Sequence, residues 1–172
     1  MNYKTRGRKS PLFLSMIRKE KIIELAQERI QELDNGNYLV EVNISPKNAI
    51  TVKVDNLNGG VSIEDCVSVS RNIEHNLDRE SEDFELQVSS PGLDQPFVVI
   101  EQYQKNIGKK VNVTTLEDKL ISGELIASNN DEITLKEVNT VKNTSTKKKE
   151  IIENVHHLKM KNIRETKLII SF

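Results

Sequence analysis

Three histidines and one cysteine are the side chains of this chain best suited to binding a metal ion, so their spacing is considered first. His156 and His157 are adjacent on a predicted strand, where neighbouring side chains point to opposite faces, so they cannot chelate one ion together. His75 stands alone on a predicted helix. A single cysteine, Cys66, excludes an intramolecular disulfide and a cysteine-rich zinc module. The sequence therefore predicts no metal site.

Motifs for nucleophilic catalysis or phosphate binding are also missing from the sequence. Ser89 and Ser90 do not lie in a GxSxG turn, and neither GxxxxGK[ST] nor GxGxxG occurs. The acidic residues within 80–85 lack the spacing of an EF-hand loop, which favours a solvated acidic loop. We therefore predict that the chain is not an enzyme and uses no cofactor and no small-molecule substrate.

Basic residues in the last third of the chain are the best candidates for binding. Lysines contact phosphate groups independently of base sequence and in a salt-sensitive way. The chain has no Trp and no GxxG loop, so base stacking and a KH-type contact are not expected. A solvated loop and a contact with an acidic protein remain alternatives. The residues assigned to this candidate RNA or ribosome contact are Lys142, Lys147, Lys148, Lys149, Lys161 and Arg164.

Charge is unevenly distributed, although the net charge of the 172 residues is only −1. Residues 11–100 carry 8 Lys/Arg and 16 Asp/Glu, whereas residues 101–172 carry 13 Lys/Arg and 10 Asp/Glu. This division predicts two modules with different partners, although two solvated surfaces would give the same pattern. No apolar run approaches the roughly 18 residues of a membrane helix, and residues 12–14 are too short for a signal-peptide core. We expect a cytoplasmic protein with no membrane partner.

Hydrophobic periodicity predicts an N-terminal unit in the order α-β-β-α-β, with both helices on one face of a small sheet. Residues 1–15 show no periodicity and are either a flexible basic arm or residues left from cloning. The predicted elements are a helix from Ser15 with apolar Ile23, Ala26, Ile30 and Leu33, strands at 38–44 and 50–54, a helix from Ser62, and a strand at 84–88.

Two features of these elements make specific predictions. In the first strand, Tyr38, Val40, Val42 and Ile44 alternate with polar or outward residues and should share the buried face. In the second helix, Ser62 followed by Asp65 resembles a capping box. Its buried face is predicted to hold Ile63, Cys66, Ile73 and Leu77.

The C-terminal part has the pattern of several short strands. Runs centred on Val111, Ile121 and Ile133 are separated by turn residues, and strands are also predicted at 151–160 and 168–170. Residues 139–149 are polar and predict a long exposed hairpin loop. Five short strands in about 65 residues suggest a small all-β barrel of the SH3 or Sm kind, with Gly123 at a bend.

The sequence thus predicts an α+β fold of two domains. The predicted boundaries are an N-terminal α/β domain over 16–96, a linker or short helix over 97–106, and an SH3/Sm-like β-barrel over 107–172.

The connection between the two predicted units has unusual composition. Gly92 allows backbone angles denied to other residues, the prolines restrict the turn, and Asp94 can cap a short helix. These properties favour a structural joint between the domains, with partner contact secondary. The segment reads Ser89, Ser90, Pro91, Gly92, Leu93, Asp94, Gln95, Pro96.

This segment is similar to the S-S-P-G-L-D-R-P motif of the ribosome maturation factor P (RimP) family. Residues 60–71, 84–88 and 102–111 also resemble family stretches, and the likeness covers roughly residues 16–172. Gln95 stands where the family has arginine and Phe97 where it has leucine, so the forked guanidinium contact is not available here.

The resemblance implies a non-catalytic cytoplasmic factor that promotes maturation of the small ribosomal subunit. It also implies binding to the assembling subunit, around small-subunit rRNA and a ribosomal protein near the decoding region. We expect a monomer whose acidic domain faces a basic ribosomal-protein tail and whose basic loop faces RNA. The alternative hypothesis is a β-barrel adaptor module that binds an acidic protein partner without RNA.

Overall fold

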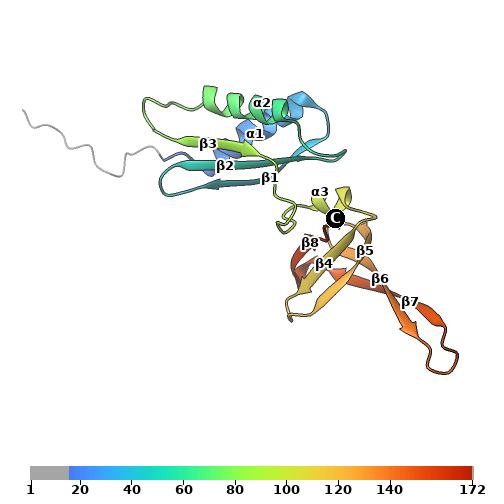
Figure 1. The fold of residues 1–172 in the computed structure, drawn as a ribbon. Coiled ribbons are helices and arrows are strands. Elements are labelled where there is room, and N and C mark those ends of the chain that lie inside the picture. Colours follow the sequence, from blue (N-terminus) through green and yellow to red (C-terminus); the bar gives the residue numbers. More distant parts are fainter. Residues whose placement is uncertain (1–15, 172) are drawn as a thin grey trace, which may run out of the picture.

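The computed structural model describes residues 16–171, so the predicted basic arm and its Ser15 N-cap lie outside the described residues. Within that range the chain has an α+β fold with two separate sheets, as predicted. Figure 1 shows a helix-covered sheet formed by the N-terminal half and a second sheet with a long projecting ribbon formed by the C-terminal half. No helix within residues 16–171 is long and apolar enough to cross a membrane.

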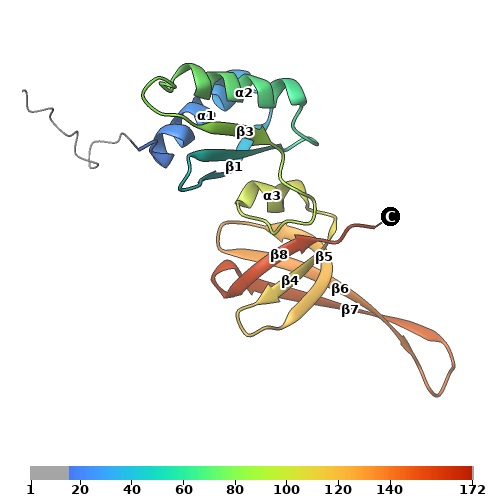
Figure 2. The same ribbon diagram turned by 60° about the vertical axis from the view of Figure 1, so that its left-hand side comes forward.

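The N-terminal half forms a three-stranded sheet with two helices on one face (Figures 1 and 2). Its elements are α1 (Lys19–Leu33), β1 (Asn37–Ile44), β2 (Ala49–Asn56), α2 (Ile63–His75) and β3 (Glu85–Ser89). β1 and β2 pair antiparallel, and β3 pairs parallel to β2, so α2 forms the crossover of a β-α-β unit. α1 starts after Arg18 and buries Ile22 and Leu25 beside the predicted Ala26 and Ile30.

A β-bulge in β1 changes which face its side chains occupy. The pairing with β2 shifts register between Leu39 and Glu41. Leu39 and Val42 therefore pack in the core beneath the helices, whereas Tyr38 and Val40 are buried outside that core. The predicted single face for these strand residues is wrong, because one inserted residue reverses the alternation.

The predicted N-cap of α2, Ser62, is confirmed, but of the four residues predicted for the buried face only Ile73 is fully buried. Cys66 and Leu77 are half-buried. Ser62 Oγ accepts a hydrogen bond from the Asp65 backbone N–H at 3.1 Å. Ile63 is 80% exposed, so its assignment to the core is wrong. Val61, the residue before the cap, packs against the core beneath the first turn instead, and Val69 is fully buried further along.

The C-terminal half forms a five-stranded antiparallel sheet in the order β7-β6-β5-β4-β8, preceded by a short helix. Its elements are α3 (Ile100–Lys105), β4 (Lys110–Thr115), β5 (Leu120–Ser128), β6 (Glu132–Lys142), β7 (Lys149–Lys159), the 3-10 turn η2 (Met160–Asn162) and β8 (Ile163–Leu168). Four of the five predicted strands are present near their predicted positions, but the last, predicted at 168–170, lies earlier in the chain, at 163–168. β7 and β8 are the two sheet edges and do not pair, so hydrogen bonds do not close the barrel. A second core, with Val111, Leu125 and Ile133 at its centre, lies in this half.

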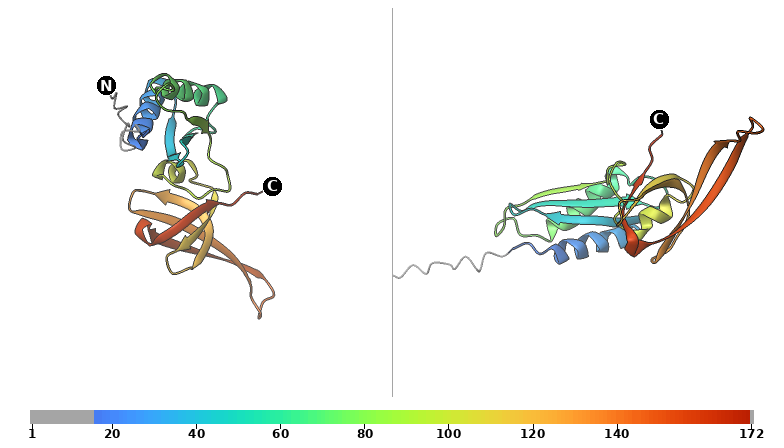
Figure 3. Two further views of the ribbon diagram at one scale, coloured as in Figure 1. Left: turned by 90° about the vertical axis from the view of Figure 1, so that its left-hand side faces the viewer. Right: turned by 90° about the horizontal axis from the view of Figure 1, so that it is seen from below.

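The predicted long loop at 139–149 is instead mostly paired strand. β6 and β7 stay in register out to the pair Lys142–Lys149, so only residues 143–148 form the turn. Both faces of the distal ribbon are exposed to solvent. Its residues therefore do not alternate between apolar and polar types, which is the pattern that predicts a half-buried strand. Figure 3 shows the ribbon extending well beyond the rest of the molecule.

Candidate functional site

The motif segment, residues 89–96, leaves β3 and is anchored at its first residue. Lys53 Nζ, on the neighbouring strand β2, donates a hydrogen bond to Ser89 Oγ at 2.9 Å. Farther along, the Gln95 backbone N–H donates to Gly92 O at 3.1 Å and closes a turn. A Cβ atom on Gly92 would lie 2.7 Å from Asp94 Oδ1, so a larger residue would displace the Asp94 side chain.

Beside the motif segment, an ion pair joins the two halves of the chain. Lys105 Nζ on α3 contacts both carboxylate oxygens of Asp55 on β2 at 2.8 Å, and the Tyr38 hydroxyl donates to Asp55 Oδ2 at 2.9 Å. Burial, followed by the hydrogen bond to the Asp55 carboxylate, raises the pKa of Tyr38 well above its ordinary value, so this hydroxyl stays a donor. We call these three residues the joint cluster.

The start of α3 is tied to the second sheet. The Phe97 backbone N–H donates to Thr166 O at 2.8 Å, and the Tyr103 hydroxyl donates to Thr166 Oγ1 at 2.9 Å. The rings of Phe97 and Tyr103 meet edge to face with centroids 5.0 Å apart. Figure 2 shows α3 between the two sheets, so it contacts both halves of the molecule.

Asp94 does not cap a helix, contrary to the prediction. The next helix, α3, begins six residues later, after the N-cap Val99. The side chain of Gln102 supplies the missing acceptor, because its Oε1 accepts from the backbone N–H of Val98 at 2.5 Å and of Val99 at 3.2 Å. The aspartate is therefore left on the surface, with its carboxylate near the turn at Gly92.

The centre of the motif segment is exposed, although its ends are held. Leu93 is 67% exposed, and Asp94 and Gln95 are exposed with it. A cavity of about 570 Å³, lined by Val40 and Lys53 among others, opens on one side of the segment. The predicted role as a joint stays a prediction, which the anchored ends support, and the exposed centre leaves room for a partner contact.

Four of the six predicted basic contact residues come together at the tip of the ribbon. Lys142 and Lys149 are directly paired across β6 and β7, and Lys147 and Lys148 lie in the connecting turn. All four side chains are exposed. Lys147 has a positive φ of 55°, and the backbone hydrogen bonds between Asn143 and residues 147 and 148 hold the turn together.

Lys161 and Arg164 lie elsewhere. Lys161 is in η2 and Arg164 in β8, so the length of β7, about 30 Å, separates them from the ribbon tip. The Arg164 guanidinium also forms an ion pair with Asp118. From the sequence these two residues were expected to contact the same partner from a position further along the chain, and in the structure they lie at the opposite end of β7 from the tip lysines.

The two adjacent histidines point to opposite faces of β7, as predicted, and each contacts a different glutamate. His156 Nε2 lies 2.8 Å from Glu137 Oε2, and His157 Nδ1 lies 3.3 Å from Glu132 Oε1. The hydrogen bond from His156 holds the pKa of Glu137 below its ordinary value. Within residues 16–171, no three His, Cys, Asp or Glu side chains are grouped closely enough to hold a metal ion.

Comparison with known proteins connects this geometry to one family. The RimP N-terminal domain model matches residues 26–94, from within α1 into the motif segment. A ribosome maturation factor RimP of Christiangramia forsetii is 44% identical over 68% of this chain and 74% of its own length. The chain belongs to the RimP family. RimP proteins of Flavobacterium psychrophilum and Porphyromonas gingivalis are 34% and 36% identical, over 90% and 78% of this chain and 98% and 86% of their own lengths.

The residues that hold α3 in place were not identified as functional from the sequence. Asp55 and Lys105 are 50 positions apart, and Tyr103 and Thr166 are 63 apart. Gln102 and Tyr103 were noted only because residues 102–111 resemble a stretch of the family's sequence. The one signal in the sequence was an acidic residue, Asp55, that follows a run of buried alternating residues on β2.

Proposed function

We propose that this chain acts in the cytoplasm as a ribosome maturation factor that binds the assembling small ribosomal subunit, without catalysis and without a cofactor. Membership of the RimP family carries this proposal, because the relatives are named ribosome maturation factors and match up to 90% of the chain. The exposed lysines at the ribbon tip also support it, because they form a positively charged surface that can contact RNA phosphates and that lies far from the acidic half.

In this proposal the two halves of the molecule have different contacts. Residues 16–96 and 107–172 act as two domains joined by 97–106, which the two separate hydrophobic cores support. The ribbon tip contacts small-subunit rRNA, and the acidic half together with the motif segment contacts a ribosomal protein near the decoding region. The free chain is a monomer in this proposal, and light scattering of the purified chain tests that state.

The role in maturation is tested with cells that lack the protein. We expect sucrose gradients of their extracts to show an excess of free small subunits that contain unprocessed rRNA. Expression of the intact chain should restore the normal profile. A normal profile in the absence of the protein, with fully processed rRNA, would overturn the proposed function.

The RNA contact is tested by reversing the charges at the ribbon tip. The variant K147E/K148E/K149E should pellet with immature small subunits at least about tenfold less well, and the remaining association should depend less on salt. The matched control is K19E/K21E/K47E, which reverses three exposed lysines in the N-terminal half. Equal pelleting of both variants would contradict the assignment of the tip as the RNA contact.

One observation favours a second candidate, an adaptor that binds an acidic protein without RNA. The ribbon carries exposed apolar side chains beside its lysines, and such side chains are typical of protein interfaces. Nuclease treatment separates the two functions, because only RNA-mediated association is lost. The exposed apolar residues of the ribbon are Val138, Val141, Ile151, Ile152 and Val155.

A further inference from the structure

The N-terminal sheet has an open edge at β3. This strand pairs with β2 on one side, and no other strand within residues 16–171 pairs with its outer side. The Glu85 backbone N–H donates to Asn48 O at 3.1 Å, which is the first bond of the β2–β3 ladder. Because backbone groups alternate in direction along a strand, the N–H and C=O groups of Leu86 and Val88 point away from β2. An extended segment can pair with those groups.

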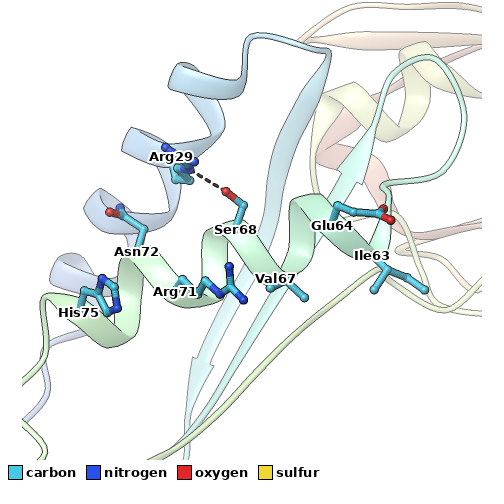
Figure 4. Close-up of a pocket in the computed structure, with 8 residues that line it drawn as sticks. All are labelled: Arg29, Ile63, Glu64, Val67, Ser68, Arg71, Asn72 and His75. Carbon is cyan, nitrogen blue, oxygen red and sulfur yellow. Dashed lines mark hydrogen bonds between the residues drawn. The ribbon is translucent and has the colours of Figure 1, made fainter.

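An apolar groove lies along the same edge, between β3 and α2. It has a volume of about 460 Å³, and its lining includes Leu86 and Val88 from β3 and Ile63 and Val67 from α2. Ile63 is 80% exposed and Val67 is 42% exposed, although both are on a helix that otherwise buries its apolar face. Figure 4 shows Val67 and Arg71 pointing away from α1, whereas Ser68 points toward Arg29 of α1. Two apolar side chains therefore border the groove without an apolar partner from α1.

The charge around the groove favours a basic occupant. Residues 61–90, which supply both walls of the groove and the loop between them, carry 8 Asp/Glu and 2 Arg. One of the two arginines, Arg79, is bound by Glu74 at 2.8 Å and lies over the Phe84 ring. Arg71 is the other, so this segment has a net charge of −6, although the residues that line the groove are themselves uncharged. At longer range this negative charge attracts lysine and arginine side chains.

We propose that the β3 edge and this groove bind an extended basic peptide segment of a protein partner. The segment adds a strand beside β3, inserts alternate apolar side chains between Val67 and Val88, and directs its basic side chains to the surrounding carboxylates. The identity of the partner as a ribosomal protein rests on the proposed function, because proteins that bind rRNA are rich in lysine and arginine.

The probe for this site is a capped ten-residue peptide in which valine and lysine alternate. Its binding should slow amide hydrogen exchange at Leu86 and Val88 at least about tenfold, since these two N–H groups become hydrogen-bonded. Exchange at Glu85 and Gln87, whose N–H groups already face β2, should change little. Cys66, the single cysteine, also lines the groove and should become protected from alkylation.

Two variants test whether the peptide binds in the groove. V67E places a carboxylate at the groove and should weaken peptide binding at least about tenfold, because the inserted apolar side chain would bury that charge. The control V138E makes the same change at another exposed valine, on the ribbon, and should bind normally. Circular dichroism confirms that both variants fold.

Specific outcomes would overturn this inference. Unchanged exchange at Leu86 and Val88, equal binding of V67E and V138E, or equal binding of a peptide with glutamate in place of lysine would each do so. These measurements contain no ribosome, so they fail independently of the proposed function. A normal ribosome profile in cells that lack the protein overturns the proposed function, whereas an inert β3 edge overturns only this site.

Discussion

Asp55 accepts hydrogen bonds from both halves of the chain at once. Lys105 reaches it from α3 and Tyr38 from β1, and the side chains of Lys105 and Asp55 are only 18% and 10% exposed. Solvent therefore screens this ion pair less than it screens a surface pair. Within the joint cluster, replacing one side chain should therefore weaken the contact between the two halves.

Replacing Lys105 should measure that coupling. K105M removes the cation but keeps most of the aliphatic side chain, and it leaves the partly buried Asp55 carboxylate without its counter-ion. We expect the free energy of unfolding in urea to fall by about 1–3 kcal/mol. K167M is the control, because Lys167 and Glu165 form an exposed pair at 3.7 Å whose loss should change stability little. Equal effects of K105M and K167M would contradict a coupling role for the joint cluster.

The thiol of Cys66 should react slowly at neutral pH. Burial, followed by the nearby Asp65 carboxylate, raises the pKa of Cys66 above its ordinary value. The thiolate is the reactive form, so the rate of alkylation by iodoacetamide should keep rising with pH beyond the range in which a free thiol has levelled off. The urea-unfolded chain is the control and should level off at lower pH. Coinciding pH profiles for the folded and unfolded chain would contradict this prediction.

At the scale of elements, local signals predicted well and non-local ones did not. The N-cap of α2 was predictable because Ser62 and Asp65 are three residues apart and need no distant partner. The β1 bulge was not predictable, because register depends on how β2 pairs with it. The ribbon was taken for a loop because a strand with two solvated faces has no apolar period, although its Val, Ile and Thr content suits a strand.

Gly123 in β5 offers a test of how closely two strands approach. A Cβ atom at this position would lie 2.7 Å from the Lys136 backbone oxygen and 3.0 Å from its carbonyl carbon. G123A should therefore displace β5 from β6 and lower the free energy of unfolding by about 1–3 kcal/mol. G60A is the matched control, because a Cβ atom on Gly60 meets no atom within 4 Å. A G123A chain as stable as G60A would show that the strand separation adjusts freely.

At the scale of the whole molecule, α3 lies between an acidic unit and a sheet whose basic ribbon projects away from it (Figures 1 and 2). The motif segment and the lysines could be named from sequence, because composition and a contiguous motif reveal them. Their arrangement could not, because it depends on contacts such as Asp55–Lys105 and on the straight length of β7. The motif segment and the ribbon tip are therefore separate surfaces, and each can be altered by mutation without changing the other.

Shortening the ribbon should separate folding from ribosome binding. Glu137 and Asn154 are directly paired, so an Asn-Gly turn can replace residues 138–153 and close a two-residue hairpin. The core residues Ile133, Leu135 and Leu158 remain, so the free energy of unfolding should change by less than about 1 kcal/mol. Association with immature small subunits should fall at least as far as in K147E/K148E/K149E. Full association of the shortened chain would assign subunit binding to the motif segment and the acidic half, because these surfaces would then suffice without the ribbon.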